Sequence, residues 1–311
     1  MQPTERERSS APGAAKKAEQ FGRVIASHGR HYMVELEDGS LRQCYPRGKK
    51  SNAAVGDRVA VLIKGDEGSI ERILPRKNLL YRSDDMRTKQ FAANVDRLLI
   101  VVAPEPAFSD DLAGRALVGA WSADIEPLIV LNKVDLPSAE QARARLEPLR
   151  QLGVPMVETV ATDPEHTRQV LLPLLQGRCT LLLGQSAMGK STILNALVPA
   201  AGAATQEHSQ ALGAGRHTTT ATRLYHLPQG GDLIDSPGFQ AFGLHHLERE
   251  DIMRGFPEFT KPMEDCRFYN CSHRHEPGCG VQAALERGEI APERHALYER
   301  LLAENEARST Y

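Results

Sequence analysis

The pattern of apolar and polar positions divides the chain into three sections. In the first section, about residues 21–74, short alternating segments such as 32–36 and 58–63 are separated by the polar turns 37–40 and 65–68. Alternation with a period of two is typical of strands that bury one face. Because the segments are short and the turns contain Gly and Asp, the pattern predicts a small β-barrel of five strands.

In the second section, about residues 94–242, continuous apolar runs alternate with helical stretches at residues 109–123 and 138–152. Near its end, residues 222–227 and the strand that ends at Asp235 are expected to form a hairpin. Apolar strands that alternate with helices predict a parallel sheet covered on both faces. The expected buried strands are residues 96–102, 127–131, 155–160 and 179–183.

From about residue 244 to the end, the pattern is helical, with a Cys/His cluster in its middle. Its last stretch, residues 292–307, is a charged amphipathic helix that we expect to pack on the cluster. The whole pattern therefore predicts a multidomain α/β protein. Its expected parts are a disordered tail at residues 1–20, a barrel at 21–80, the sheet domain at 81–243 and a helical metal-binding domain at 244–311.

The overall composition says little about function, whereas the distribution of charge along the chain is more informative. The 311 residues are 41% hydrophobic and 25% charged with a net charge of −2, which is ordinary for a soluble protein. No apolar run approaches the ~20 residues that span a bilayer. Residues 1–20 lack the apolar core of a secretion signal, so we expect a cytoplasmic protein without a membrane partner. Between residues 22 and 90, 14 Lys and Arg stand against 9 Asp and Glu, which indicates a basic, nucleic-acid-binding surface or merely an uneven solvated face.

A phosphate-binding loop follows the fourth buried strand. The sequence G-x-x-x-x-G-K-S-T comes directly after this strand and leads into a helical run at residues 192–197. Glycines let backbone N–H groups surround phosphates, and the helix N-terminus adds partial positive charge. We expect Lys190 to contact the terminal phosphates and the Ser191 hydroxyl to bind Mg²⁺. The loop consists of Gly184, Gln185, Ser186, Ala187, Met188, Gly189, Lys190, Ser191 and Thr192.

The motif that selects the base, Asn132-Lys133-Val134-Asp135, precedes the phosphate loop, which reverses the usual order. Asp135 can accept both N–H groups on the pairing edge of guanine, whereas adenine would leave the carboxylate unpaired. Asn132 would brace the loop and contact the base, and the Lys133 stem would lie over the ring. The motif favours GTP and disfavours an ATP-dependent kinase or transporter-type ATPase. Residues 160–162 are a candidate partner loop for the base, or simply the end of a strand.

A D-x-P-G motif ends the last strand of the second section. Asp235 is expected to hold Mg²⁺ through water, and the Gly238 N–H is expected to sense the γ-phosphate. A polar loop before the hairpin ends in Gly-Arg-His-Thr-Thr-Thr, and one of these threonines would complete the Mg²⁺ shell. Among them, Thr219 is our candidate.

The residue after the D-x-P-G glycine bears on hydrolysis. Many GTPases place a water-orienting Gln there, but this chain has Phe239, which cannot take that part. Another group or a partner must therefore position the water. His217 is the first candidate, because an imidazole with an ordinary pKa of about 6.5 can act as a base. The alternative is a histidine that only shapes the loop.

The Cys/His cluster has the spacing C-x₄-C-x-H-x₅-C, formed by Cys266, Cys271, His273 and Cys279. Three thiolates and one imidazole suit tetrahedral structural zinc, and no position is left open for water. In a cytoplasmic protein such a cluster indicates metal before disulfide, so we expect one structural zinc and no catalysis there.

Taken together, these motifs and their order resemble the RsgA family (also called YjeQ or YloQ) of circularly permuted GTPases over about residues 21–303. The resemblance implies an OB-fold barrel, a permuted GTPase domain and a zinc domain. It also implies a late factor in maturation of the small ribosomal subunit that binds this subunit and its rRNA, with weak GTP hydrolysis to GDP and phosphate that the subunit stimulates. The family places a catalytic role on His217. The resemblance rests on residues 92–96, 131–135, 184–191, 215–220, 235–238 and 266–279.

One position departs from the family pattern, since Ala187-Met188 stands where members often carry Gly-Val. Because the backbone does the binding, both pairs are expected to fit. A second hypothesis for the whole chain is a nucleotide-gated RNA-binding clamp with negligible turnover. Subunit-stimulated hydrolysis would separate the two hypotheses. Nothing in the pattern indicates an oligomer, so a monomer is expected.

Overall fold

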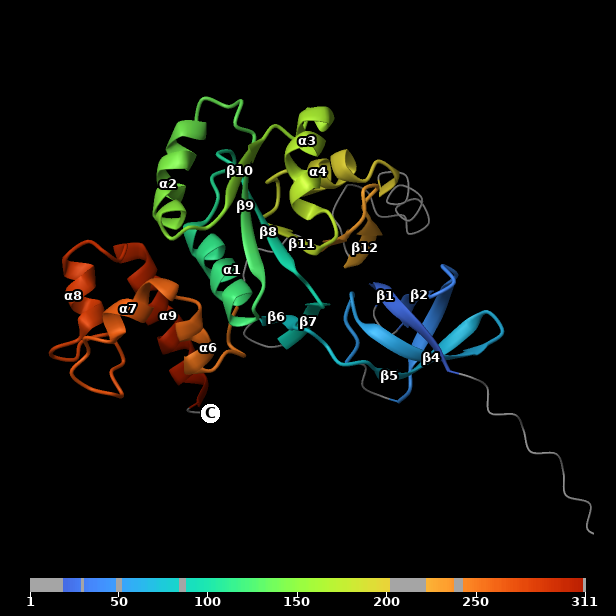
Figure 1. Cartoon of the computed structure of the whole chain (residues 1–311), viewed down its shortest axis with the longest axis horizontal. Helices are drawn as coiled ribbons and strands as arrows, with labels where there is room; N and C mark the ends of the chain where they lie inside the picture. Colours follow the sequence, from blue (N-terminus) through green and yellow to red (C-terminus); the bar gives the residue numbers. More distant parts are fainter. Residues whose placement is uncertain are drawn as a thin grey trace, which may run out of the picture.

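The first five strands close into a small barrel (Figure 1). In the computed structural model, residues 19–28, 31–48, 52–83, 88–201, 222–237 and 243–309 are described. Antiparallel pairs join β1 to β2 and β4, β2 to β3, and β4 to β5, while β3 and β5 are parallel. The predicted five-stranded barrel is confirmed, and it is closed in an OB-like order. Its strands are β1 (Gln20–His28), β2 (His31–Leu36), β3 (Leu41–Pro46), β4 (Arg58–Lys64) and β5 (Glu67–Ile73).

Burial along these strands follows the alternation in the sequence. In β2 every second residue is buried, from Tyr32 to Leu36. The turn after β4 is shorter than the polar pattern indicated, because Lys64 already pairs with Glu67. The two residues between them form the turn, and Gly65 has φ +64°, a conformation that glycine adopts without a steric penalty.

A second hairpin, β6 (Leu79–Ser83) and β7 (Thr88–Ala93), connects the barrel to the sheet domain, and the sequence pattern did not predict it. Asn78 fixes the hairpin to the segment that precedes β8, since its side chain bonds both the N–H and the carbonyl of Val95 at 2.9 and 2.8 Å. Asn94 fixes it to the barrel, where its amide donates to the Gly56 carbonyl at 3.0 Å.

The sheet domain has the strand order β10-β9-β8-β11-β13-β12. All neighbours are parallel except β12 and β13, which form the predicted hairpin. Each predicted strand is confirmed, with ends that differ by at most one residue. The strands are β8 (Arg97–Val102), β9 (Glu126–Asn132), β10 (Met156–Thr159), β11 (Cys179–Gly184), β12 (Arg223–His226) and β13 (Asp232–Asp235).

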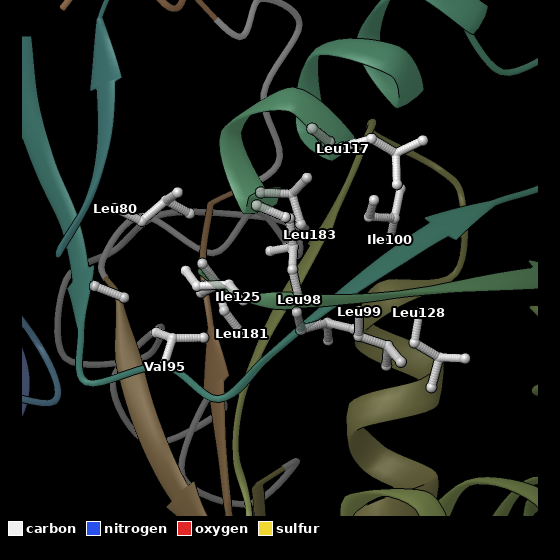
Figure 2. Close-up of a cluster of buried hydrophobic side chains, with 14 of the residues drawn as sticks. Leu80, Val95, Leu98, Leu99, Ile100, Leu117, Ile125, Leu128, Leu181 and Leu183 are labelled. Atoms are coloured by element: carbon white, nitrogen blue, oxygen red, sulfur yellow. The ribbon is translucent and has the colours of Figure 1, made fainter. Parts of the chain in front are cut away.

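Helices cover both faces of this sheet (Figure 1). On one face α1 packs on β8 and β9, and on the other α3 and α4 pack on each other and on β10 and β11. Figure 2 shows this division within one strand, with Ile100 of β8 directed toward Leu117 of α1 and Leu99 directed away from it. The helices are α1 (Asp110–Ser122), α2 (Ala139–Gln151), α3 (Pro164–Leu175) and α4 (Lys190–Leu197).

The C-terminal part is helical, as predicted, but its last helix does more than pack on the Cys/His cluster. The helix α9 also contacts α1 of the sheet domain and α6. Arg115 of α1 makes a bidentate ion pair with Glu304 of α9. The described elements are α6 (Arg249–Arg254), the 3₁₀ helix η1 (Pro257–Phe259), α7 (Thr260–Met263), α8 (Gly280–Glu286) and α9 (Pro292–Ser309). Within the described ranges, no helix combines the length and the apolar character needed to cross a membrane.

The barrel and the sheet domain also share backbone pairing. Ala26 of β1 pairs with Arg223 of β12, so one eleven-stranded sheet runs through both parts. Beside this junction, the side chain of His226 lies between Glu35 of the barrel and Asp232 of β13. The last barrel-facing strand of the sheet domain is therefore held by hydrogen bonds from both backbone and side chains.

Candidate nucleotide and metal sites

The phosphate loop connects β11 to α4 at the carboxyl edge of the sheet, where parallel sheets bind ligands. Gly189 is the N-cap of α4 and has φ +95°, which a side chain rarely tolerates. Ala187 also has positive φ, at +64°. This left-handed conformation gives a physical reason why glycine is common at that position in the family that the sequence resembles.

The side chain of Lys190 folds back onto its own loop. Its Nζ donates to the carbonyls of Gly184 and Gln185 at 2.7 and 2.8 Å. Burial lowers the pKa of Lys190, while the charge of Asp235 opposes that shift. The ammonium group therefore sits at the mouth of the loop, where phosphates would compete for it with two neutral carbonyls.

Asn132 joins three loops at this edge of the sheet. It is 1% exposed, its Nδ2 donates to the Met188 carbonyl at 2.9 Å, and its Oδ1 accepts from the Ala161 N–H at 2.9 Å. The first contact reaches the phosphate loop, and the second reaches the loop after β10. The base motif, the phosphate loop and the candidate partner loop at residues 160–162 are thus brought together around one buried amide.

The rest of the base motif forms a turn before α2. Lys133 has φ +61°, and its Nζ donates to the carbonyls of Ala187 and Glu105 at 2.9 and 2.7 Å. The Lys133 carbonyl accepts from the Leu136 N–H at 3.1 Å, which closes the turn around Val134 and Asp135. The Asp135 side chain is exposed, and no described residue bonds its carboxylate.

The expected magnesium ligands fall on two neighbouring elements. Asp235 ends β13, is 2% exposed, and pairs in register with Leu182 of β11. Ser191 lies in the first turn of α4, directly after β11 and its loop. The next residue after Asp235, Ser236, donates to the Leu182 carbonyl at 2.9 Å and so fixes the end of β13 to β11. Carboxylate and hydroxyl oxygens are the ligand types that Mg²⁺ prefers.

Three expected site residues, His217, Thr219 and Gly238, lie outside the described residues, as does most of the expected tail at 1–20. Sequence reasoning also missed two contacts at the site. The Oε1 of Gln185 accepts from the backbone N–H of Ser109, the N-cap of α1, at 2.7 Å. Glu105 is bonded to the base motif, although no motif in the sequence includes it.

The Cys/His cluster converges in the C-terminal part. The ligand atoms of Cys266, Cys271, His273 and Cys279 all lie within 4.8 Å of one another, and the last three residues are buried. The Sγ of Cys266 lies 3.5 Å from Nδ1 of His273 and 4.0 Å from Sγ of Cys279. Burial lowers the pKa of His273, which favours the neutral imidazole that binds metals. This group could hold a metal ion, and its donors suit zinc.

Neighbouring groups orient these ligands. Backbone N–H groups of Gly280 and Gln282 donate to the sulfurs of Cys266 and Cys279 at 3.3 and 3.5 Å. The His273 carbonyl accepts from Nε2 of His295 in α9 at 2.8 Å. Such contacts stabilise thiolates and hold the imidazole in place. The sequence indicated the four ligands but not these supporting bonds.

Comparisons with known proteins extend these similarities over nearly the whole chain. The family model of the RsgA GTPase matches residues 73–245. A curated relative, the small ribosomal subunit biogenesis GTPase RsgA of Bordetella pertussis, is 68% identical over 293 residues, which cover 93% of this chain and 98% of the relative. The protein of the same name from Burkholderia pseudomallei is 55% identical over 306 residues, 97% of each chain.

Solved structures show the same similarity in three dimensions. YjeQ from Thermotoga maritima superposes with a TM-score of 0.71 at 32% identity, over 93% of this chain and 99% of that one. YloQ, described as a circularly permuted GTPase, has a TM-score of 0.68 at 29% identity, over 96% and 99% of the two chains. The similarity therefore includes the barrel, the sheet domain and the helical C-terminal part.

Proposed function

The chain belongs to the RsgA GTPase family and is a GTP hydrolase with circularly permuted motifs. From this premise we propose that it binds the small ribosomal subunit and its rRNA and hydrolyses GTP to GDP and phosphate during late maturation of that subunit. This partner follows from the names of its relatives in Bordetella and Burkholderia. Such a protein acts in the cytoplasm, where these subunits are assembled, and we propose that it acts as a monomer.

One observation carries the nucleotide part of the proposal. The buried Asn132 amide bonds both the phosphate loop, at Met188, and the loop after β10, at Ala161. A base contacted by Asp135 would then lie beside phosphates held by residues 184–192. Asp135 would accept from the pairing edge of guanine, and Lys133 would cover the ring. The motifs are out of the usual order in the chain, but they meet at one edge of the sheet.

The chemistry of hydrolysis requires charge neutralisation and a positioned water. Mg²⁺ would be held by Ser191, Thr219 and, through water, Asp235, and when bound it neutralises charge on the phosphates. Lys190 would leave its two loop carbonyls for the terminal phosphates, and the Gly238 N–H would bond the γ-phosphate. Since Phe239 cannot orient water, we assign the general base to His217.

The C-terminal cluster has a structural part in this proposal. Zinc would be held by Cys266, Cys271, His273 and Cys279, with no position open for substrate. It would stabilise a short segment that has little regular secondary structure between α7 and α8. The cluster therefore supports the fold of the C-terminal part and takes no direct part in hydrolysis.

The test is GTP hydrolysis with and without purified small ribosomal subunits. For the wild type we expect strong stimulation, and for His217→Ala we expect stimulation to be lost while GTP binding is retained. His208→Ala is the matched control, because it changes another histidine in the polar stretch of sequence between α4 and β12. If the His217→Ala variant is still stimulated, the small ribosomal subunit remains the partner, but His217 is not the general base. A wild type without stimulation would reject the partner and favour a nucleotide-gated clamp.

A further inference from the structure

The loop between β8 and α1 belongs to no nucleotide-binding motif, yet one of its residues bonds both the base motif, at Lys133, and the N-cap of the following helix, at Ser138. The main-chain carbonyl of Glu105 accepts from Nζ of Lys133 at 2.7 Å. The carboxylate of the same residue accepts from the hydroxyl of Ser138. Lys133 and Ser138 lie on either side of Asp135 in the chain. Glu105 thus spans the segment that carries the guanine-selecting carboxylate.

The hydroxyl of Ser138 does not make the hydrogen bond that is usual for a serine at the start of a helix. Ser138 occupies the N-cap position of α2, where a serine oxygen ordinarily accepts a bond from a backbone N–H of the first turn. No side-chain cap bond forms here, and the hydroxyl donates to Glu105 instead. The carboxylate thereby lies near the N-terminus of α2, where negative charge is favourable. Ser138 therefore contributes to the position of the loop and not to a standard cap.

Glu105 can act as an anchor because its own loop is fixed. Arg145 of α2 donates to the Phe108 carbonyl at 2.7 Å, and its guanidinium lies 4.1 Å from the centroid of the Phe108 ring. At the end of the loop, the backbone N–H of Ser109 donates to Gln185 of the phosphate loop at 2.7 Å. Prolines on both sides of Glu105 restrict the backbone further.

We propose that Glu105 is a positioning residue for guanine recognition. It holds the segment from Lys133 to Ser138 in the conformation in which Asp135 meets the pairing edge of the base. Asp135 is exposed and no described residue bonds its carboxylate, so its direction depends on the backbone that carries it. When the carboxylate is already in position, the loop does not lose conformational entropy on binding, and the affinity is higher for that reason. The inference rests on the guanine site proposed above.

The choice of nucleotide separates this effect from a general loss of structure. Guanine presents two N–H groups to Asp135, whereas hypoxanthine in inosine diphosphate lacks the exocyclic amino group and presents one. If the Asp135 carboxylate is no longer held in the right direction, the binding free energy of GDP falls by more than that of IDP, because GDP has two hydrogen bonds to lose. A substitution that only destabilises the domain lowers the affinity for both nucleotides by the same factor.

The experiment measures the Kd of GDP and IDP by calorimetry, with Mg²⁺ and the full chain. We expect Glu105→Ala and Ser138→Ala each to raise the Kd of GDP by about 5- to 10-fold and that of IDP by only about 2-fold. The double variant should be no weaker than either single one, because both remove the same bond. Glu105→Gln keeps an acceptor oxygen and should restore most of the GDP affinity. The matched control is Glu147→Ala, which removes another exposed glutamate, one on α2.

Four results would overturn the proposal. The first two are single variants that bind GDP like the wild type and an equal weakening of GDP and IDP binding. The other two are effects that add in the double variant and a failure of Glu105→Gln to restore affinity for GDP. A wild type that binds ADP as tightly as GDP would instead reject the guanine site itself, so the two failures are distinguishable.

Discussion

Gly189 of the phosphate loop lies directly against Asn132 of the base motif: a Cβ built on Gly189 would be 2.1 Å from Nδ2 of Asn132. That amide cannot move aside freely, because it donates to Met188 and its oxygen accepts from Ala161. The glycine that starts α4 is therefore required by the neighbouring motif as well as by its own φ of +95°.

The first prediction concerns this contact. Gly189→Ala should raise the Kd of GDP by at least about tenfold, because the methyl group displaces the Asn132 amide and the backbone conformation adds ~1–2 kcal/mol of strain. Gly153→Ala is the matched control, since Gly153 has φ +78° with nothing within 4 Å of its added Cβ. Calorimetric titration with GDP measures both. Equal GDP affinities for Gly189→Ala and the wild type would show that the close contact between Gly189 and Asn132 is not needed for nucleotide binding.

The second prediction concerns the metal cluster. The purified chain should contain one zinc, and Cys271→Ser should lose it, because three donors hold zinc far more weakly than four. GDP binding should persist, since the nucleotide site uses other elements. Elemental analysis and limited proteolysis of the C-terminal part provide the measurements. Cys44→Ala, which removes a buried thiol in the barrel, should keep its zinc. A Cys271→Ser protein with full zinc would reject the assignment.

The third prediction concerns the ion pair between α1 and α9. Arg115 is 9% exposed and binds both oxygens of Glu304 as well as Asp111. Arg115→Met should lower the free energy of unfolding by about 2 kcal/mol, because it leaves the partly buried Glu304 carboxylate without its partner, whereas Asp111 keeps its ion pair with Arg300. Denaturant titration followed by circular dichroism measures this.

Arg143→Met is the control for that experiment, since Arg143 pairs with Glu140 and Glu158 at the surface of α2. No measurable change in stability is expected for the control, because solvent screens exposed pairs. Equal effects of the two substitutions would show that the α1–α9 pair is no stronger than a surface pair.

The fourth prediction concerns pH and the junction of barrel and sheet. The ring of His226 bonds Asp232 at 2.7 Å and Glu35 at 2.9 Å. Burial alone would lower the pKa of His226, but the bond to Asp232 and the charge of Glu35 outweigh it and raise the pKa. A protonated imidazole can donate to both carboxylates at once, whereas a neutral one can donate to only one.

Because the folded-state pKa is raised, the stabilisation is fully present below the unfolded value of about 6.5 and is lost as pH rises through the folded value. The difference in melting temperature between the wild type and His226→Gln should therefore be largest below about pH 6 and shrink at higher pH. His166→Gln, at an exposed position of α3, is the control. A difference that grows with pH would contradict the assignment.

The local sequence pattern determined most of the secondary structure. Apolar runs in β8, β9 and β11 predicted their bounds to within one residue, because a strand buried on both faces needs an unbroken apolar segment. Ser109 and Asp163 cap α1 and α3 through side-chain bonds that a short-range motif can encode. Spacing also indicated the four ligands of the metal cluster, since metal coordination restricts residue type and separation.

Contacts between distant segments were decided only by the tertiary structure. Nothing in the residues around Asn132 reveals that its amide meets Met188, 56 positions away. The pairing of β1 with β12 likewise depends on the register of two strands that are separated by most of the chain. Such contacts depend on how elements pack, and no local periodicity records that packing.

Glu105 shows this limit most clearly. In the sequence it is one acidic residue between two prolines, and its exposure would be ordinary for a surface loop. Only the folded arrangement of the loop after β8 and the segment between β9 and α2 places its carbonyl at Lys133 and its carboxylate at Ser138. The sequence by itself determined which residues could read guanine, because hydrogen-bonding chemistry resides in residue type. The tertiary structure decided what holds them in position, because positioning depends on atoms that are neighbours only after the chain has folded.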